Sequence, residues 1–268
     1  MKASHRKLAA AVLNAAEPQA KAAAAAAAMS ALNDIVIGEE DDFAPPDRPA
    51  RPARPELAAP GEVPRRRLTS PKGRAALLHA IAHIELNAID LAFDMAARFA
   101  GAVAAEGLDA TAFVTDWFEV GADEARHFAM LERRMATLGV SYGDFPAHDG
   151  LWTAAEATRD DVLARLAIAP MVLEARGLDV TPAMIERLEA ADDEESAAIL
   201  KTIYVEEVDH VRKGARWFNS VCAARGLSVT DTFQRLVAER FAGKLKRPFN
   251  HNARLEAGLA QSLYEPLA

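Results

Sequence analysis

The sequence predicts an all-α fold whose centre is a four-helix bundle, and three observations lead to this class. Of the 268 residues, 51% are hydrophobic and only 6% are aromatic, with Ala the commonest apolar type. This composition favours packed helices over β-sheet. Four long segments carry apolar residues at helical spacing. Two of them contain Glu-x-x-His, at 124–127 and 207–210, a spacing that places both side chains on one side of a helix.

An N-terminal region, residues 1–69, is expected to lie outside the bundle. Its Ala-rich part, 3–33, predicts one or two peripheral helices interrupted at Pro18. The segment 45–67 is rich in Pro and Arg, and so many prolines predict an extended strap without periodic structure. Its arginines would suit RNA or an acidic partner. We favour the alternative that the strap binds the acidic surface of its own domain.

The bundle is expected over residues 70–228, and its first two helices form a hairpin. Ser70 is a suitable N-cap before Pro71, and the first helix covers 75–99. Glu85 lies within its apolar stripe, where a carboxylate is costly unless it is paired or bound to metal. A separate polar stripe on another face of the first helix contains His83, Asn87, Asp90 and Asp94. The second helix, 111–138, places Glu124 and His127 among apolar residues.

A loop at 140–150 is long enough to cross the bundle and to begin a second hairpin. The third helix is expected at 153–176, ended by Gly177, with Glu174 on its apolar face and a kink at Pro170. A short helix at 181–190 follows. The fourth long helix, 193–225, carries Glu207 and His210. The C-terminal region, 229–268, is expected to hold one helix at 230–242 and a tail.

The order of the side chains is therefore Glu, Glu-x-x-His, crossover, Glu, Glu-x-x-His. A bundle with this pattern holds a dinuclear metal site. Four desolvated carboxylates repel one another, and two divalent cations would cancel their charge. For any single residue, a surface charge or a satisfied core polar group is a reasonable alternative, but four in this order argue against it. The predicted ligands are Glu85, Glu124, His127, Glu174, Glu207 and His210.

The donor set favours two iron ions, and manganese fits it as well. Oxygen-rich sites with two nitrogens and no thiolate suit these metals, and ligand geometry does not exclude zinc. The single Cys222 rules out an internal disulfide framework and indicates a reduced, cytoplasmic setting. A net charge of −8 gives no reason to favour nucleic acid or an anionic membrane as a partner. The sequence has no uninterrupted apolar run of membrane-spanning length.

These motifs, over residues 75–225, resemble the ferritin-like di-iron carboxylate superfamily. Within it, 79–91 (His-Ala-Ile-Ala-His-Ile-Glu-Leu-Asn-Ala-Ile-Asp-Leu), 146–155, 170–182 and 246–254 resemble a bacterial ferritin-like family of unassigned function. The resemblance implies a ferritin-like bundle and a di-iron site. It also implies an O2-dependent oxidase or hydroxylase with an unknown small-molecule substrate and electron donor. Two alternatives stay open: a tRNA-modifying hydroxylase, and a non-catalytic metal-binding or ferroxidase-type protein.

The acids that precede the two ligand glutamates are candidates for a supporting role. Residues 123–127 resemble the Asp-Glu-x-x-His form of di-iron monooxygenases. That resemblance implies that the first acid contacts the His of the partner helix. We therefore expect Asp123 to approach His210 and Glu206 to approach His127. The alternative is that both acids are simply solvated.

Overall fold

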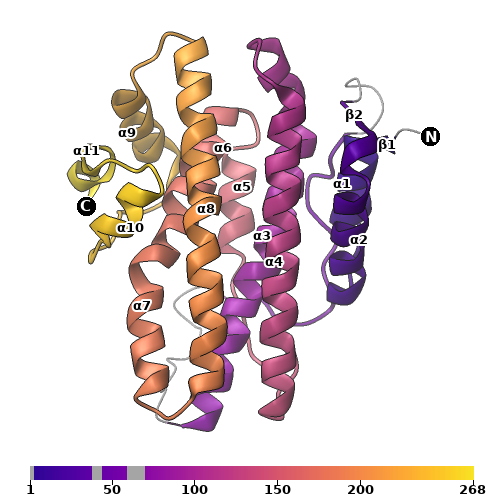
Figure 1. The fold of residues 1–268 in the computed structure, drawn as a ribbon, viewed down its shortest axis with the longest axis vertical. Coiled ribbons are helices and arrows are strands. Elements are labelled where there is room, and N and C mark those ends of the chain that lie inside the picture. Colours follow the sequence, from indigo (N-terminus) through magenta and orange to yellow (C-terminus); the bar gives the residue numbers. More distant parts are fainter. Residues whose placement is uncertain (1–2, 38–43, 59–69) are drawn as a thin grey trace.

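The computed structural model describes residues 3–37, 44–58 and 70–268, and it confirms the all-α class. Long antiparallel helices form the central bundle, flanked by the N-terminal helices on one side and the C-terminal helices on the other (Figure 1). The bundle helices are α3 (Pro71–Ala105), α4 (Ala110–Thr137), α7 (Ala175–Glu189), which continues α6 (Val162–Ile168), and α8 (Glu194–Ala224).

The first hairpin, α3 with α4, agrees with its prediction. Ser70 caps α3 by accepting a hydrogen bond from the Gly73 N–H at 3.1 Å, and Pro71 occupies the first turn. Gly107, with a φ of 74°, turns the chain after α3. Asp109 then caps α4 by accepting from the Thr111 and Ala112 N–H groups. The caps fix where each helix begins, and with that the height of Glu85 and Glu124 in the bundle.

The third bundle helix differs from its prediction. In place of one helix at 153–176, the chain forms α5 (Gly150–Ala157), a turn, and α6, which begins where Asp161 accepts from the Leu163 N–H. A π-helical turn, η3 (Ala169–Glu174), joins α6 to α7. Gly177 does not end a helix, and no separate helix begins at 181, because α7 runs continuously through both positions.

Two prolines explain this segment. Pro170 lies in η3, where the predicted kink takes the form of a wider turn. Its ring reaches α8 at Gly214, where an added Cβ would lie 2.4 Å from the Pro170 Cβ. Pro182 lies inside α7 and has no N–H for the carbonyl of Leu178. The side chain of Asn250 supplies that hydrogen bond from the C-terminal tail at 3.2 Å, so the helix tolerates the proline.

The second hairpin is completed by α8, as predicted. Asp193 caps α8 by accepting from the Ser196 N–H, and the chain turns at Gly226 with a φ of 66°. Beyond it, the predicted C-terminal helix is α9 (Val229–Arg240). The tail adds α10 (His251–Glu256), α11 (Gln261–Tyr264) and η4 (Glu265–Leu267). Arg254 binds Asp179 of α7 through two hydrogen bonds, so the tail is fixed against the bundle.

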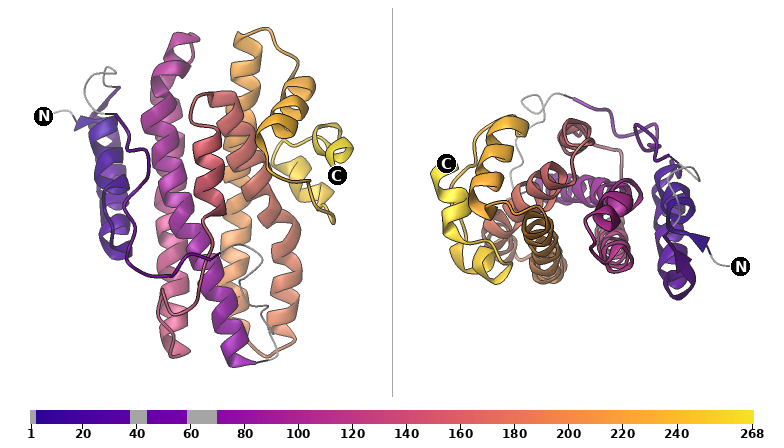
Figure 2. Two further views of the ribbon diagram at one scale, coloured as in Figure 1. Left: turned by 180° about the vertical axis from the view of Figure 1, so that it is seen from behind. Right: turned by 90° about the horizontal axis from the view of Figure 1, so that it is seen from above.

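The N-terminal region packs against α3 and α4, as Figure 2 shows from above. It consists of β1 (Ala3–Ser4), α1 (His5–Leu13), α2 (Pro18–Ser30), η1 (Leu32–Asp34) and β2 (Ile35–Val36), which pairs with β1 in parallel. Pro18 is the first residue of α2, so it separates the two helices as expected. Lys21 of α2 is fully buried against Asp90 of α3.

The described part of the strap, 45–58, binds acidic groups of its own domain. Arg51 lies 2.8 Å from Asp90, and Arg48 lies 2.6 Å from Asp149. The Ala58 N–H also donates to the carbonyl of Ala147 in the crossover. For residues 45–58, the interpretation that the strap binds its own domain is confirmed. The rest of the strap, 59–67, lies outside the described residues.

One described helix, α3, is long and apolar enough to span a membrane by length and composition. However, 78% of its apolar window is buried inside the bundle. Most of this apolar surface therefore packs against the protein's own helices.

Candidate metal centre

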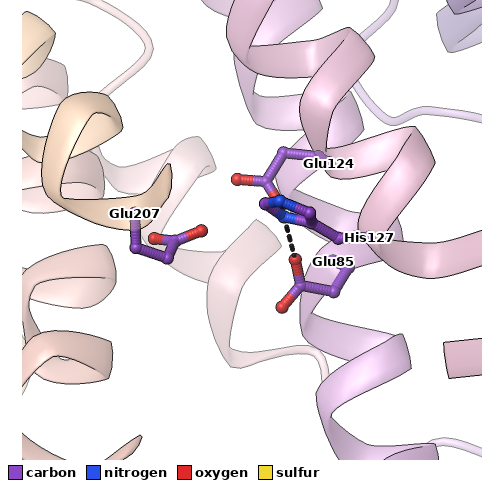
Figure 3. A group of neighbouring side chains, drawn as sticks. All are labelled: Glu85, Glu124, His127 and Glu207. Atoms are coloured by element: carbon purple, nitrogen blue, oxygen red, sulfur yellow. Dashed lines mark hydrogen bonds and ion pairs between the residues drawn. The ribbon is translucent and has the colours of Figure 1, made fainter. Parts of the chain in front are cut away.

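The first half of the site comes from α3 and α4. His127 Nδ1 lies 3.1 Å from Glu85 Oε2 and 3.4 Å from Glu124 Oε2. All three side chains are buried. Figure 3 shows them pointing toward one another, with Glu207 of α8 facing them across the bundle. Ligand atoms of these four residues lie within 4.8 Å of one another, which is close enough to share one metal ion.

The second half repeats this arrangement from α8. His210 Nδ1 lies 3.1 Å from Glu124 Oε1 and 3.4 Å from Glu207 Oε1. The imidazole rings of His127 and His210 are 5.8 Å apart. Glu124 therefore stands between the two histidines, with one carboxylate oxygen facing each imidazole.

Glu174 completes the group from the π-helical turn η3. It lines the same cavity as Glu85, Glu124 and Glu207, and its Oε2 has no hydrogen-bond partner among the described residues. Glu124 Oε2 has only the longer contact with His127. The structure thus brings all six predicted side chains to one centre. A buried carboxylate oxygen without a hydrogen-bond donor is unfavourable, and a bound cation would give each of these oxygens a partner.

The charges at this centre are strongly coupled. Burial raises the pKa of Glu85, Glu174 and Glu207, and nearby carboxylates raise each of them further. Burial would also raise the pKa of Glu124, but the two imidazoles that face its oxygens hold it well below its ordinary value. Against the effect of burial, the neighbouring carboxylates of Glu124 and Glu85 raise the pKa of His127 to about 11. Without metal, the centre therefore holds extra protons that a cation must displace.

Each imidazole turns its second nitrogen outward to an acid of the partner helix. His127 Nε2 lies 2.6 Å from Glu206, and His210 Nε2 lies 3.3 Å from Asp123. Both predicted contacts are present, so these acids are not simply solvated. A hydrogen bond of this kind fixes the imidazole so that Nδ1 faces the centre.

Arg126 joins the two acids and was missed in the sequence. Its guanidinium donates to Asp123 at 2.6 Å and to Glu206 at 2.8 Å. Together with the histidines, this contact lowers the pKa of Glu206 and brings that of Asp123 to about 2, although partial burial opposes both shifts. A sign of the contact was available, because Arg126 follows Asp123 by one helical turn within the same motif.

A family model described as "Protein of unknown function (DUF455)" matches residues 14–265. The chain belongs to this family. It is also 40% identical, over 228 residues, to a protein of Haemophilus influenzae that is named only as an uncharacterized protein. That match covers 85% of this chain and 79% of the relative. No solved structure matches the chain.

Glu206→Gln should weaken metal binding by about 10–100-fold, because the amide no longer holds the His127 proton as a carboxylate does. Titration of the metal-stripped protein with Mn(II) measures the loss. Asp209→Asn is the matched control, since Asp209 lies on the same helix and binds Arg212 and Lys213 instead. Parental affinity in Glu206→Gln would show that Glu206 has no such role.

The metal-free protein should lose stability between about pH 7 and about pH 9. The raised pKa values of His127, His210 and the three glutamates mean that the folded state holds more protons than the unfolded state, so the unfolding free energy falls as pH rises. This window lies above the ordinary His pKa of 6.5, so His5 and His83, whose pKa values burial lowers to about 4, no longer contribute. Urea midpoints of chelator-treated protein test this prediction. A midpoint that rises across the window would contradict it.

Proposed function

We propose that this chain is a dinuclear metal protein of the ferritin-like di-iron carboxylate type, acting as an O2-dependent oxidase or hydroxylase. Two iron ions would be held by Glu85, Glu124, His127, Glu174, Glu207 and His210, and manganese fits the same donors. The observation that carries the proposal is Glu124, a buried carboxylate placed between two imidazoles that both point Nδ1 at it. A cytoplasmic location accords with the single buried Cys222.

The chain's own residues fit this role. Glu206 and Asp123 hold the protons at the Nε2 atoms, so each Nδ1 would present its lone pair to a cation once it has released its own proton. Glu174 and Glu124 each offer a buried oxygen that lacks a hydrogen-bond donor. When bound, the iron ions would supply the binding and reduction of O2. The protein would orient the ligands, exclude bulk water and release the protons that the metal displaces.

The tRNA-modifying alternative requires a basic surface formed by the strap and the tail. Most described arginines of both segments are instead paired with acids of this chain, as in Arg48 with Asp149, Arg51 with Asp90 and Arg254 with Asp179. Strap residues 59–67 lie outside the described residues. No observation favours nucleic acid over a small-molecule substrate.

The decisive experiment is metal analysis followed by O2 uptake. Protein expressed without added metal should contain about two iron or manganese ions per chain. After anaerobic reduction of the iron form, admission of O2 should lead to its consumption. Binding of metal without O2 uptake would leave the non-catalytic alternative. Uptake in fixed proportion to added Fe(II) would indicate a ferroxidase, and absence of metal would overturn the proposal.

A further inference from the structure

A cavity of about 160 Å³ lies beside the carboxylate centre, between α3, α7 and α8. Glu85, Glu124, Glu174 and Glu207 line it. Ile84, which is 43% exposed, also lines it, so the cavity extends toward the surface. The remaining wall is mainly aliphatic and includes Ile81, Ala88, Val180, Met184, Leu200 and Ile203.

Gly177 is the residue in this wall that packing does not explain. It lies inside α7, where glycine is less stable than alanine. Gly121 and Gly214 also lie inside helices, but an added Cβ there would meet Phe93 at 2.5 Å and Pro170 at 2.4 Å. At Gly177 an added Cβ would meet nothing within 4 Å. Since Gly177 lines the cavity, its missing side chain leaves space there.

The polar groups of the cavity wall are not placed to form an ion pair with a charged ligand. Among the described residues that line the cavity, Arg176 is the one cation, and its Nη1 donates to the carbonyls of Lys246 and Pro248 in the tail. An anion would face four glutamates. A cation would find those glutamates already neutralised by two divalent ions. Transfer of any charge into an aliphatic wall without a partner is unfavourable.

We propose that this cavity admits a neutral, apolar molecule or side group about the size of a benzene ring, and that Gly177 sets its size limit. An engineered apolar cavity of roughly 150 Å³ binds benzene, and the cavity here has about that volume when no metal ion is counted in it. The inference rests on the proposed function, in that the bound group would be the substrate facing the metal centre. Binding of an uncharged group requires only the cavity, whereas rejection of a cation also requires that metal ions neutralise the four glutamates.

The test compares three ligands of similar shape, namely toluene, benzoate and benzylammonium, by calorimetric titration of the full chain as purified. Toluene should bind, and the two ions should bind at least about tenfold more weakly. Gly177→Leu should weaken toluene binding by about tenfold or more, because its added methylenes occupy the cavity. Gly177→Ala is the matched control and should retain binding. Both variants should keep the metal content of the parent.

Failure of this inference differs from failure of the proposed function. Toluene binding without O2 uptake would overturn the O2-dependent function but support the cavity as an apolar binding site. O2 uptake without toluene binding would support the function but overturn the inference about the cavity. Benzoate or benzylammonium binding as tightly as toluene would overturn the inference. Unchanged toluene binding in Gly177→Leu would overturn the role of Gly177. If that variant does not fold, Met184→Trp fills the same cavity from another position and is held to the same outcomes.

Discussion

Adding Mn(II) to the metal-free protein should raise its melting temperature by about 10–20 °C. Two sites, each at about 100 times its dissociation constant, stabilise the folded state by roughly 5 kcal/mol together. For a chain of this size, each kcal/mol corresponds to about 2–4 °C. The physical source is the four carboxylates, which repel one another or keep their protons until a cation binds. Differential scanning calorimetry with and without metal measures the shift.

Glu174→Gln gives the sharpest version of this experiment. Burial and Glu207 raise the pKa of Glu174, which favours the neutral form of this side chain in the metal-free protein, and Gln resembles that neutral form. The variant should therefore melt like the parent without metal but lose about half of the metal-induced rise, about 5–10 °C. The control is Glu186→Gln, an exposed position on α7. A full rise in Glu174→Gln would show that Glu174 is not a ligand, and no rise in the parent would contradict metal binding altogether.

The carboxylate centre could be predicted from the sequence because its signal is local. Each Glu and His stands within an apolar stripe of its own helix, and helical spacing alone determines which side chains share a face. The contacts of His127 with Glu206 and of His210 with Asp123 could also be anticipated, from the resemblance of residues 123–127 to a known motif. Nothing beyond the order of the helices was needed to bring the six side chains together.

The third helix could not be predicted in the same way, because partners distant in sequence decide its course. Pro182 and Gly177 are ordinary signs of a helix boundary. Yet Asn250 satisfies the carbonyl that Pro182 leaves free, and the cavity gives Gly177 a place inside the helix. The π-helical turn likewise depends on the fit of Pro170 against Gly214 of the neighbouring helix. Such contacts between distant segments cannot be predicted from the local sequence.

The polar stripe of α3 is a further case in which the sequence reveals the face but not its neighbour. Asp90 and Asp94 are fully buried, although both are charged residues. Lys21 of α2 and Arg51 of the strap reach Asp90, and Arg165 of α6 reaches Asp94. These three cations come from segments that lie far from α3 in sequence. The buried ion pairs therefore fix where the N-terminal region and α6 sit on the bundle.

Lys21→Met should destabilise the protein by about 3–5 kcal/mol, because it leaves Asp90 in the interior with only part of its compensation. Lys21 Nζ lies 2.5 Å from Asp90 Oδ1, and both side chains are fully buried. Burial lowers the pKa of Lys21 and raises that of Asp90, so each group depends on the other to stay charged. The melting temperature should fall by roughly 6–20 °C. Urea unfolding gives the free energy.

Two companion variants separate the buried charge from simple loss of packing. Lys201→Met removes an exposed ammonium that pairs with Glu189, and it should change the stability far less than Lys21→Met does. The double variant Lys21→Met with Asp90→Leu should be more stable than Lys21→Met alone, because the buried carboxylate that has lost one of its two cations is gone and an apolar side chain fills its place. A double variant less stable than the single one would mean that loss of the Arg51–Asp90 ion pair costs more than removal of the Asp90 carboxylate gains. Equal losses in Lys21→Met and Lys201→Met would contradict the assignment of Lys21–Asp90 as the contact that holds the N-terminal helices on the bundle.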